Sequence, residues 1–135
     1  MENFLILGKA CLLIYALLFL VLVLHELIHL LFILLFKKKV ISINIHPFGG
    51  KVVYENDHQY GQIFWISTAP NLILPFIGGA MLYFSESIYS HLFSMLCILN
   101  LFNFVPFTGD GSAILYSALK WWEEHTQKTF PNNKT

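Results

Sequence analysis

The chain has 135 residues, of which 56% are hydrophobic and 12% charged, so it is long enough for one domain and too apolar for an ordinary soluble one. Eight lysines balance eight acidic residues and arginine is absent, which excludes a basic surface for binding nucleic acid. Cys11 and Cys97 lie apart in apolar runs, which excludes a disulfide framework and a cysteine metal site.

The first predicted element is an apolar stretch over residues 10–36, which only the polar residues of HELIH interrupt. It exceeds the roughly 20 apolar residues that an α-helix needs to cross a bilayer. It is also too long for the hydrophobic core of a signal peptide. We therefore predict that this stretch is a retained membrane span.

His25, Glu26 and His29 lie in the middle of this span. Residues four apart share one face of a helix, so both imidazoles can bind one ion with the glutamate beside them as a general base. On a soluble helix the same pattern arises by chance at little cost. In a membrane span a glutamate costs about 2.5 to 3.5 kcal/mol, so it should face the interior of the bundle and have a partner. The pattern therefore predicts a zinc site.

The polar segment that follows, residues 37–60, contains two β-prone runs. Isoleucines alternate with polar residues over 41–45, and a second run lies at 52–54. The sequence FGG at 48–50 supplies turn residues between them. We predict a small β-hairpin over 41–54, the alternative being a simple polar connector.

Two further apolar stretches follow the hairpin. Residues 61–84 carry no charge, but Pro70 and Pro75 should bend or break this second span locally. Residues 91–119 form the third stretch, which is interrupted at Asp110 and is therefore predicted to be discontinuous. The three stretches predict an all-α integral membrane fold, with three transmembrane helices and a small cytoplasmic β-hairpin between the first two.

The lysines predict how the spans are oriented. Only Lys9 lies before the first span, whereas the other lysines lie between spans one and two or after span three. Because cytoplasmic loops carry an excess of lysine, residues 37–60 and the C-terminus should be cytoplasmic. We expect one membrane-embedded domain over 1–125 and a polar cytoplasmic tail at 126–135. The absence of arginine, with abundant Ile, Phe, Asn and Lys, is typical of AT-rich bacterial genomes, so we expect a multi-pass protein of a bacterial cell membrane.

A catalytic zinc usually takes three protein ligands and leaves its fourth position to water. Among the remaining His, Asp and Glu residues, Asp110 alone lies inside a span at a helix break. It lies ten residues before Lys120, and His29 lies eight before Lys37. At about 1.5 Å per residue, both are roughly 12 to 15 Å from the cytoplasmic boundary. We therefore predict one Zn2+ per chain, bound by His25, His29 and Asp110.

These motifs resemble those of the site-2 proteases, a family of intramembrane zinc metalloproteases. HELIH resembles the HExxH motif of their first core span, and NFVPFTGDG, from Asn103 to Gly111, resembles their Asn, Pro, Asp-Gly motif. FGG at 48–50 resembles the glycine-bearing loop after the first core helix, and STAPN at 67–71 resembles a stretch of the second. The motifs occur in the family's order and cover most of the chain.

The resemblance implies metal-assisted hydrolysis of a membrane-spanning protein or peptide substrate near the cytoplasmic face. Zinc would lower the pKa of a bound water, and Glu26 would move its proton to the leaving amine. Asn103 would donate to the substrate backbone or the developing oxyanion, or would alternatively cap the helix break. The hairpin would offer an edge to the unwound substrate. The expected partners are this substrate, the lipid bilayer and, optionally, a regulatory membrane protein.

Three other functions compete with this one. An inactive relative could serve as a membrane adaptor or immunity protein, but a pure binder has no need for Glu26. A membrane metal carrier or sensor is disfavoured by the same glutamate. A soluble HExxH peptidase with a downstream glutamate ligand is disfavoured by the three apolar stretches.

Overall fold

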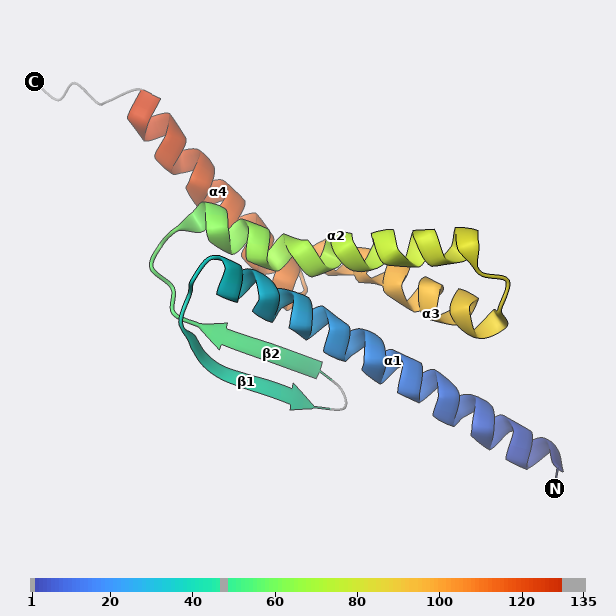
Figure 1. The fold of residues 1–135 in the computed structure, drawn as a ribbon. Coiled ribbons are helices and arrows are strands. Elements are labelled where there is room, and N and C mark those ends of the chain that lie inside the picture. The colour runs from blue at the N-terminus through green and yellow to red at the C-terminus, as the bar shows by residue number, and fades with distance from the viewer. Residues whose placement is uncertain (1, 47–48, 130–135) are drawn as a thin grey trace, which may run out of the picture.

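The computed structural model describes residues 2–46 and 49–129 of the chain. This part of the chain is mostly helical, with one two-stranded antiparallel sheet (Figure 1). In chain order the elements are α1 (Glu2–Leu35), β1 (Val40–His46), β2 (Gly49–Tyr54), α2 (Tyr60–Phe84), α3 (Ile88–Ile98), the 3-10 helix η1 (Leu99–Phe104) and α4 (Gly109–Thr129).

Helix α1 is long and apolar enough to cross a membrane, yet only 6% of its most apolar window is buried. Its N-terminal half projects beyond the other helices (Figure 1), where Phe4 is 79% and Leu12 69% exposed. A helix that is apolar on every side and unpacked in water would be unstable, so its composition suits lipid. The helix begins at Glu2, ahead of the predicted start at residue 10, because residues 3–9 contain no helix-breaking proline.

Helix α2 is the second helix long and apolar enough to cross a membrane, and half of its apolar window is buried. It lies at the centre of the bundle, in contact with α1, α3, η1 and α4 (Figure 1). Of the predicted bend or break at Pro70 and Pro75, the structure excludes the break, because α2 runs continuously from Tyr60 to Phe84. Each proline removes one backbone hydrogen bond, and packing on several sides keeps the helix intact.

The third predicted stretch is a bent pair of helices. The axis turns by 45° between Ile88–Phe104 and Gly109–Gln127. The described residues thus hold two helices able to span a membrane, or three spans if the bent pair counts as one. The break at 105–108 is followed by Gly109, the first residue of α4, and then by Asp110. Helix α4 continues to Thr129, so residues 126–129 of the predicted tail are helical, and 130–135 lie outside the described residues.

Strands β1 and β2 form the predicted hairpin. They are antiparallel, with Ile43 opposite Val52, and β2 lies between β1 and α1 (Figure 1). At the base of the hairpin, the buried ammonium group of Lys38 forms an ion pair with Asp57. The predicted turn residue Phe48 lies outside the described residues. The ion pair therefore joins the segments that enter and leave the hairpin.

A small apolar core lies where α1, α2 and α3 meet. Val21, Leu74 and Cys97 are buried there, and Leu24 and Ile28 of α1 pack against them. On the same helix His25 lies one turn after Val21, so the histidines lie beside this core. The core therefore fixes the rotation of α1 at the level where its histidines lie.

Candidate metal centre

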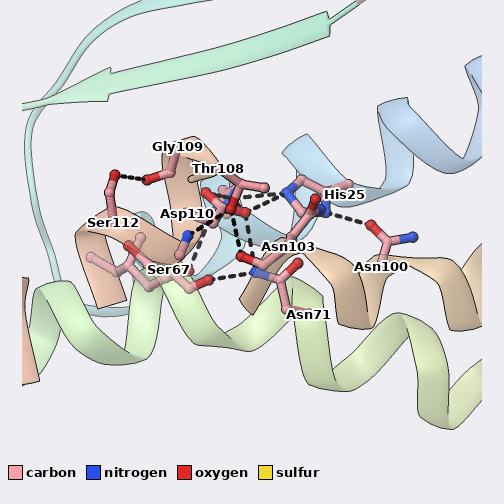
Figure 2. Close-up of polar contacts among 12 residues, drawn as sticks. His25, Ser67, Asn71, Asn100, Asn103, Thr108, Gly109, Asp110 and Ser112 are labelled. Carbon is pink, nitrogen blue, oxygen red and sulfur yellow. Dashed lines mark hydrogen bonds and ion pairs between the residues drawn. The ribbon is translucent and has the colours of Figure 1, made fainter. Parts of the chain in front are cut away.

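His25, His29 and Asp110 converge where α1 meets the start of α4. The His25 Nε2 atom lies 2.9 Å from Asp110 Oδ2 and 3.1 Å from His29 Nε2. His29 Nε2 lies 3.2 Å from Asp110 Oδ1. Figure 2 shows His25 and Asp110 pointing toward one another. The structure thus brings together the three side chains that were predicted from sequence to be ligands.

The separations between these atoms fit a tetrahedral zinc ion. Zinc binds imidazole nitrogen at about 2.0 to 2.1 Å, so ligand atoms at tetrahedral angles lie roughly 3.3 Å apart. With Asp110 Oδ2 as the carboxylate ligand atom, the three pairs, at 2.9, 3.1 and 3.3 Å, are near this value. Two imidazoles and one carboxylate are also a donor set that zinc accepts, and three protein ligands leave one position open.

Glu26 lies beside the three ligands. It is 6% exposed, and its Oε2 atom has no hydrogen-bond partner among the described residues. A buried carboxylate oxygen without a partner is unfavourable. A water molecule at the open coordination position would supply the missing donor. The orphaned oxygen therefore fits a metal site with a general base.

Each histidine is held through its second ring nitrogen. His29 Nδ1 lies 2.9 Å from the Ile66 carbonyl oxygen in α2. His25 Nδ1 lies 2.9 Å from Asn100 Oδ1 in η1 (Figure 2). The amide nitrogen of Asn100 donates to two carbonyls of α3, so its oxygen faces His25. Because both partners are acceptors, each Nδ1 carries the proton and each Nε2 is free to bind metal.

Asp110 is oriented by α2 and by the start of its own helix. Fully buried Asn71 directs its Nδ2 to Asp110 Oδ2 at 3.1 Å (Figure 2). The Thr108 hydroxyl caps α4 by accepting from the Gly111 N–H at 3.0 Å. A Cβ atom at Gly111 would overlap the Val105 carbonyl, so glycine allows the helix start to pack this closely.

Two cavities meet at the cluster. One of about 590 Å³ is lined by aliphatic side chains of α1 and of the α3–η1 segment, and one of about 430 Å³ is lined by β2, α2 and the end of α1. The residues common to both are Glu26, Gly50, Gly109 and Asp110. A Cβ atom at Gly50 would overlap the Glu26 side chain, so β2 passes directly over the glutamate. A peptide occupying both cavities would pass the metal ligands.

Residues 18–119 match the DUF3267 family, which is described as "Putative zincin peptidase". The chain belongs to this zincin family. The matched region includes HELIH, the hairpin, α2 and Asp110, so it contains every residue of the centre described above. Membership indicates a zinc metallopeptidase and does not specify the site-2 type. No curated protein matches the chain.

Asn103 lies in the wall of the larger cavity of this zincin, on η1. Its backbone carbonyl accepts a hydrogen bond from the Thr108 hydroxyl at 2.7 Å. The cap at the helix break is therefore Thr108 and not the Asn103 side chain. The amide of Asn103 shares a cavity with Glu26, where a bound peptide could meet both.

Three polar side chains around the zincin centre were not among the residues predicted from the sequence. Asn100 and Thr108 were not singled out, and Asn71 was noted only as a letter of STAPN. An amide in an apolar stretch needs a buried partner, as Glu26 does, so this signal could have revealed both asparagines. Thr108 had a capping signal, because it directly precedes the glycine that starts α4.

Tyr54, at the end of β2, also lines the smaller cavity. Burial, followed by the negative charge of Asp110, raises the pKa of the Tyr54 phenol. The phenol is therefore neutral at neutral pH and available as a hydrogen-bond donor to a molecule in the cavity.

Proposed function

We propose that this zincin is a membrane-embedded endopeptidase of the site-2 protease type, which hydrolyses a membrane-spanning protein or peptide near the cytoplasmic face. The observation that carries this proposal is the convergence of His25, His29 and Asp110, with both histidines inside a helix apolar enough for a membrane. Beside them lies Glu26, whose Oε2 has no hydrogen-bond partner among the described residues. Family membership supports the metallopeptidase part. The position of the histidines within the apolar α1 supports the intramembrane part.

The residues of the centre divide the chemistry among them. His25, His29 and Asp110 would hold one zinc ion, which supplies Lewis acidity toward a water molecule and the scissile carbonyl. Glu26 Oε2, the buried acceptor, would take a proton from the attacking water and deliver it to the leaving amine. Asn103, in the same cavity, would donate to the substrate backbone or to the developing oxyanion.

The hairpin offers a means of holding the substrate. Peptide bonds in a transmembrane helix are already hydrogen-bonded, so the substrate must unwind before hydrolysis. One edge of β2 pairs with β1, while β2 residues from Gly50 to Tyr54 contribute to the wall of the smaller cavity. An extended substrate segment could add to the strand at this cavity and lie beside Glu26.

The proposed setting is a multi-pass protein of a bacterial cell membrane. The lysines favour a cytoplasmic location for residues 37–60 and the C-terminus, and lipid would cover the exposed N-terminal half of α1. The proposed partners are the transmembrane substrate, the bilayer and a regulatory membrane protein. Such a partner could contact the part of α1 that no other element covers.

The test compares the zinc content of detergent-purified wild-type protein with that of His29→Ala and Asp110→Ala. We expect about one zinc per wild-type chain and little in either variant, because each loses one of three ligands. Glu26→Gln should keep the zinc and lose hydrolysis of a transmembrane peptide by about 10² or more. A folded wild-type protein without zinc would contradict the proposal and favour an inactive membrane adaptor or immunity protein.

A further inference from the structure

The acceptor that holds His29 is a backbone carbonyl inside a continuous helix. The Ile66 carbonyl would normally accept the N–H of the residue four positions later in α2. That residue is Pro70, which has no N–H and whose ring also pushes against the carbonyl at position i−4. The carbonyl that proline leaves without a helical partner is thus the one that accepts from His29 Nδ1, at 2.9 Å.

The second proline of α2 provides a comparison within the same helix. Pro75 frees the carbonyl of Asn71 in the same way. Among the described residues, no side chain donates to that carbonyl. The two prolines therefore make equivalent gaps in the helical hydrogen bonds, and the gap made by Pro70 alone faces a metal-binding side chain.

We propose that Pro70 is a positioning residue of the metal centre. By withholding a backbone N–H, it reserves the Ile66 carbonyl for the His29 Nδ1–H group. His29 is thereby fixed in the tautomer that presents Nε2 to the ion. Ile66, Pro70 and His29 are all buried, so water cannot replace the carbonyl as an acceptor. This inference rests on the proposed metal site.

A backbone N–H at position 70 would compete with His29 for the Ile66 carbonyl. A weakened Nδ1 contact would let the imidazole rotate or change tautomer and so present a protonated Nε2. Loss of such a supporting hydrogen bond typically lowers metal affinity by about 10- to 100-fold. The helix itself should become more regular, because alanine restores the missing hydrogen bond. Metal affinity and helix stability should therefore change in opposite directions.

The test measures zinc affinity of the full-length protein in detergent, by competition with a chromophoric chelator. Pro70→Ala should bind zinc about 10- to 100-fold more weakly than wild type, while Pro75→Ala should stay within about twofold. The thermal unfolding midpoint should be unchanged or higher in both variants. Long-range ¹H–¹⁵N spectra of the zinc-free protein should show the His29 proton on Nδ1 in wild type and a tautomer mixture in Pro70→Ala.

A further variant separates the missing N–H from the packing of the proline ring. Lactic acid, the α-hydroxy analogue of alanine, can be placed at position 70 by nonsense suppression. It has the side chain of alanine but no N–H, so it should retain wild-type zinc affinity. Equal losses in the alanine and lactic acid variants would overturn the inference, because ring packing would then be the cause.

The outcomes distinguish this inference from the proposed function. If wild type binds zinc and Pro70→Ala binds it equally well, the role of Pro70 is refuted and the metal site stands. If wild type binds no zinc, the metal site and the inference fail together. Weak zinc binding that is confined to Pro70→Ala and is restored by lactic acid at position 70 supports both the metal site and the role of Pro70.

Discussion

Each metal-facing side chain is held by a polar group on another helix or on η1. The pairs are His25 with Asn100, His29 with the Ile66 carbonyl, and Asp110 with Asn71. All three supporting groups come from parts of the chain that lie beside α1 and α4 rather than on them. Supporting contacts of this kind orient metal ligands before the ion binds, which raises metal affinity.

Replacing Asn100 should separate this supporting role from catalysis. Asn100→Leu removes the acceptor for His25 Nδ1 at similar volume, so zinc affinity should fall by about 10- to 100-fold. Asn100→Asp keeps an acceptor oxygen and should recover most of the affinity. The measurement is chelator competition on folded protein. Equal affinities of the leucine variant and wild type would show that the contact does not support the metal.

Replacing Asn103 should affect catalysis and not zinc affinity. Asn103 lines the larger cavity, and among the described residues no hydrogen bond joins its side chain to His25, His29 or Asp110. Asn103→Ala should leave zinc affinity within about twofold of wild type. If it stabilises the oxyanion as proposed, kcat for a transmembrane peptide should fall by about 10² to 10³ with a smaller change in KM. Unchanged kcat would remove Asn103 from the catalytic residues.

At the residue scale, the sequence predicted the three side chains that converge at the candidate metal centre and missed those that support them. Glu26 stood out because a charged group inside an apolar stretch needs a reason, and the i, i+4 histidines have a spacing that geometry explains. Asn100 has no such spacing to any ligand. Ile66 contributes a backbone oxygen, which no side-chain pattern can reveal, although a proline four residues later marks it.

The tip of the hairpin lies against α1, where Gly50 of β2 rests on Glu26. At its base, the Lys38–Asp57 ion pair joins the segments that enter and leave the hairpin. The hairpin can therefore define the width of the space between β2 and the general base.

Gly50→Ala should disturb Glu26 without removing zinc. The added Cβ would overlap the glutamate side chain, which must then move, while the three ligands are untouched. We expect peptide hydrolysis to fall by about 10²-fold with zinc content still near one per chain. Gly79→Ala is the matched control, because nothing lies within 4 Å of its added Cβ. Equal activity of the Gly50 variant and wild type would show that β2 does not position the base.

At the element scale, hydropathy and β-propensity predicted the two long helices and the hairpin. They did not predict that α2 would continue through two prolines, because the packing of α1, α3 and α4 around it depends on the whole fold. The 3-10 geometry of η1 was equally inaccessible, since the sequence LNLFNF is compatible with an ordinary helix. The break at 105–108 was visible because it contains proline and precedes a charge.

For the whole molecule, the number of membrane crossings depends on the bent pair. If α3, η1 and α4 together form one span, the C-terminus lies on the side opposite the loop at 85–87. If they form a re-entrant loop, both lie on the same side. The lysines of α4 and the loop at 37–60 favour the first arrangement, because both segments then lie in the cytoplasm.

Single cysteines at Glu55, Ser87 and Gln127 should distinguish the two arrangements. All three positions are exposed. Cys11 is replaced by serine, and Cys97 can remain because it is buried. In intact cells a membrane-impermeant thiol reagent should label Ser87→Cys only, since the other two positions would face the cytoplasm. Labelling of all three after permeabilisation is the control. Labelling of Gln127→Cys in intact cells would establish the re-entrant loop, and Asp110 would then reach the histidines from the same side as the 85–87 loop.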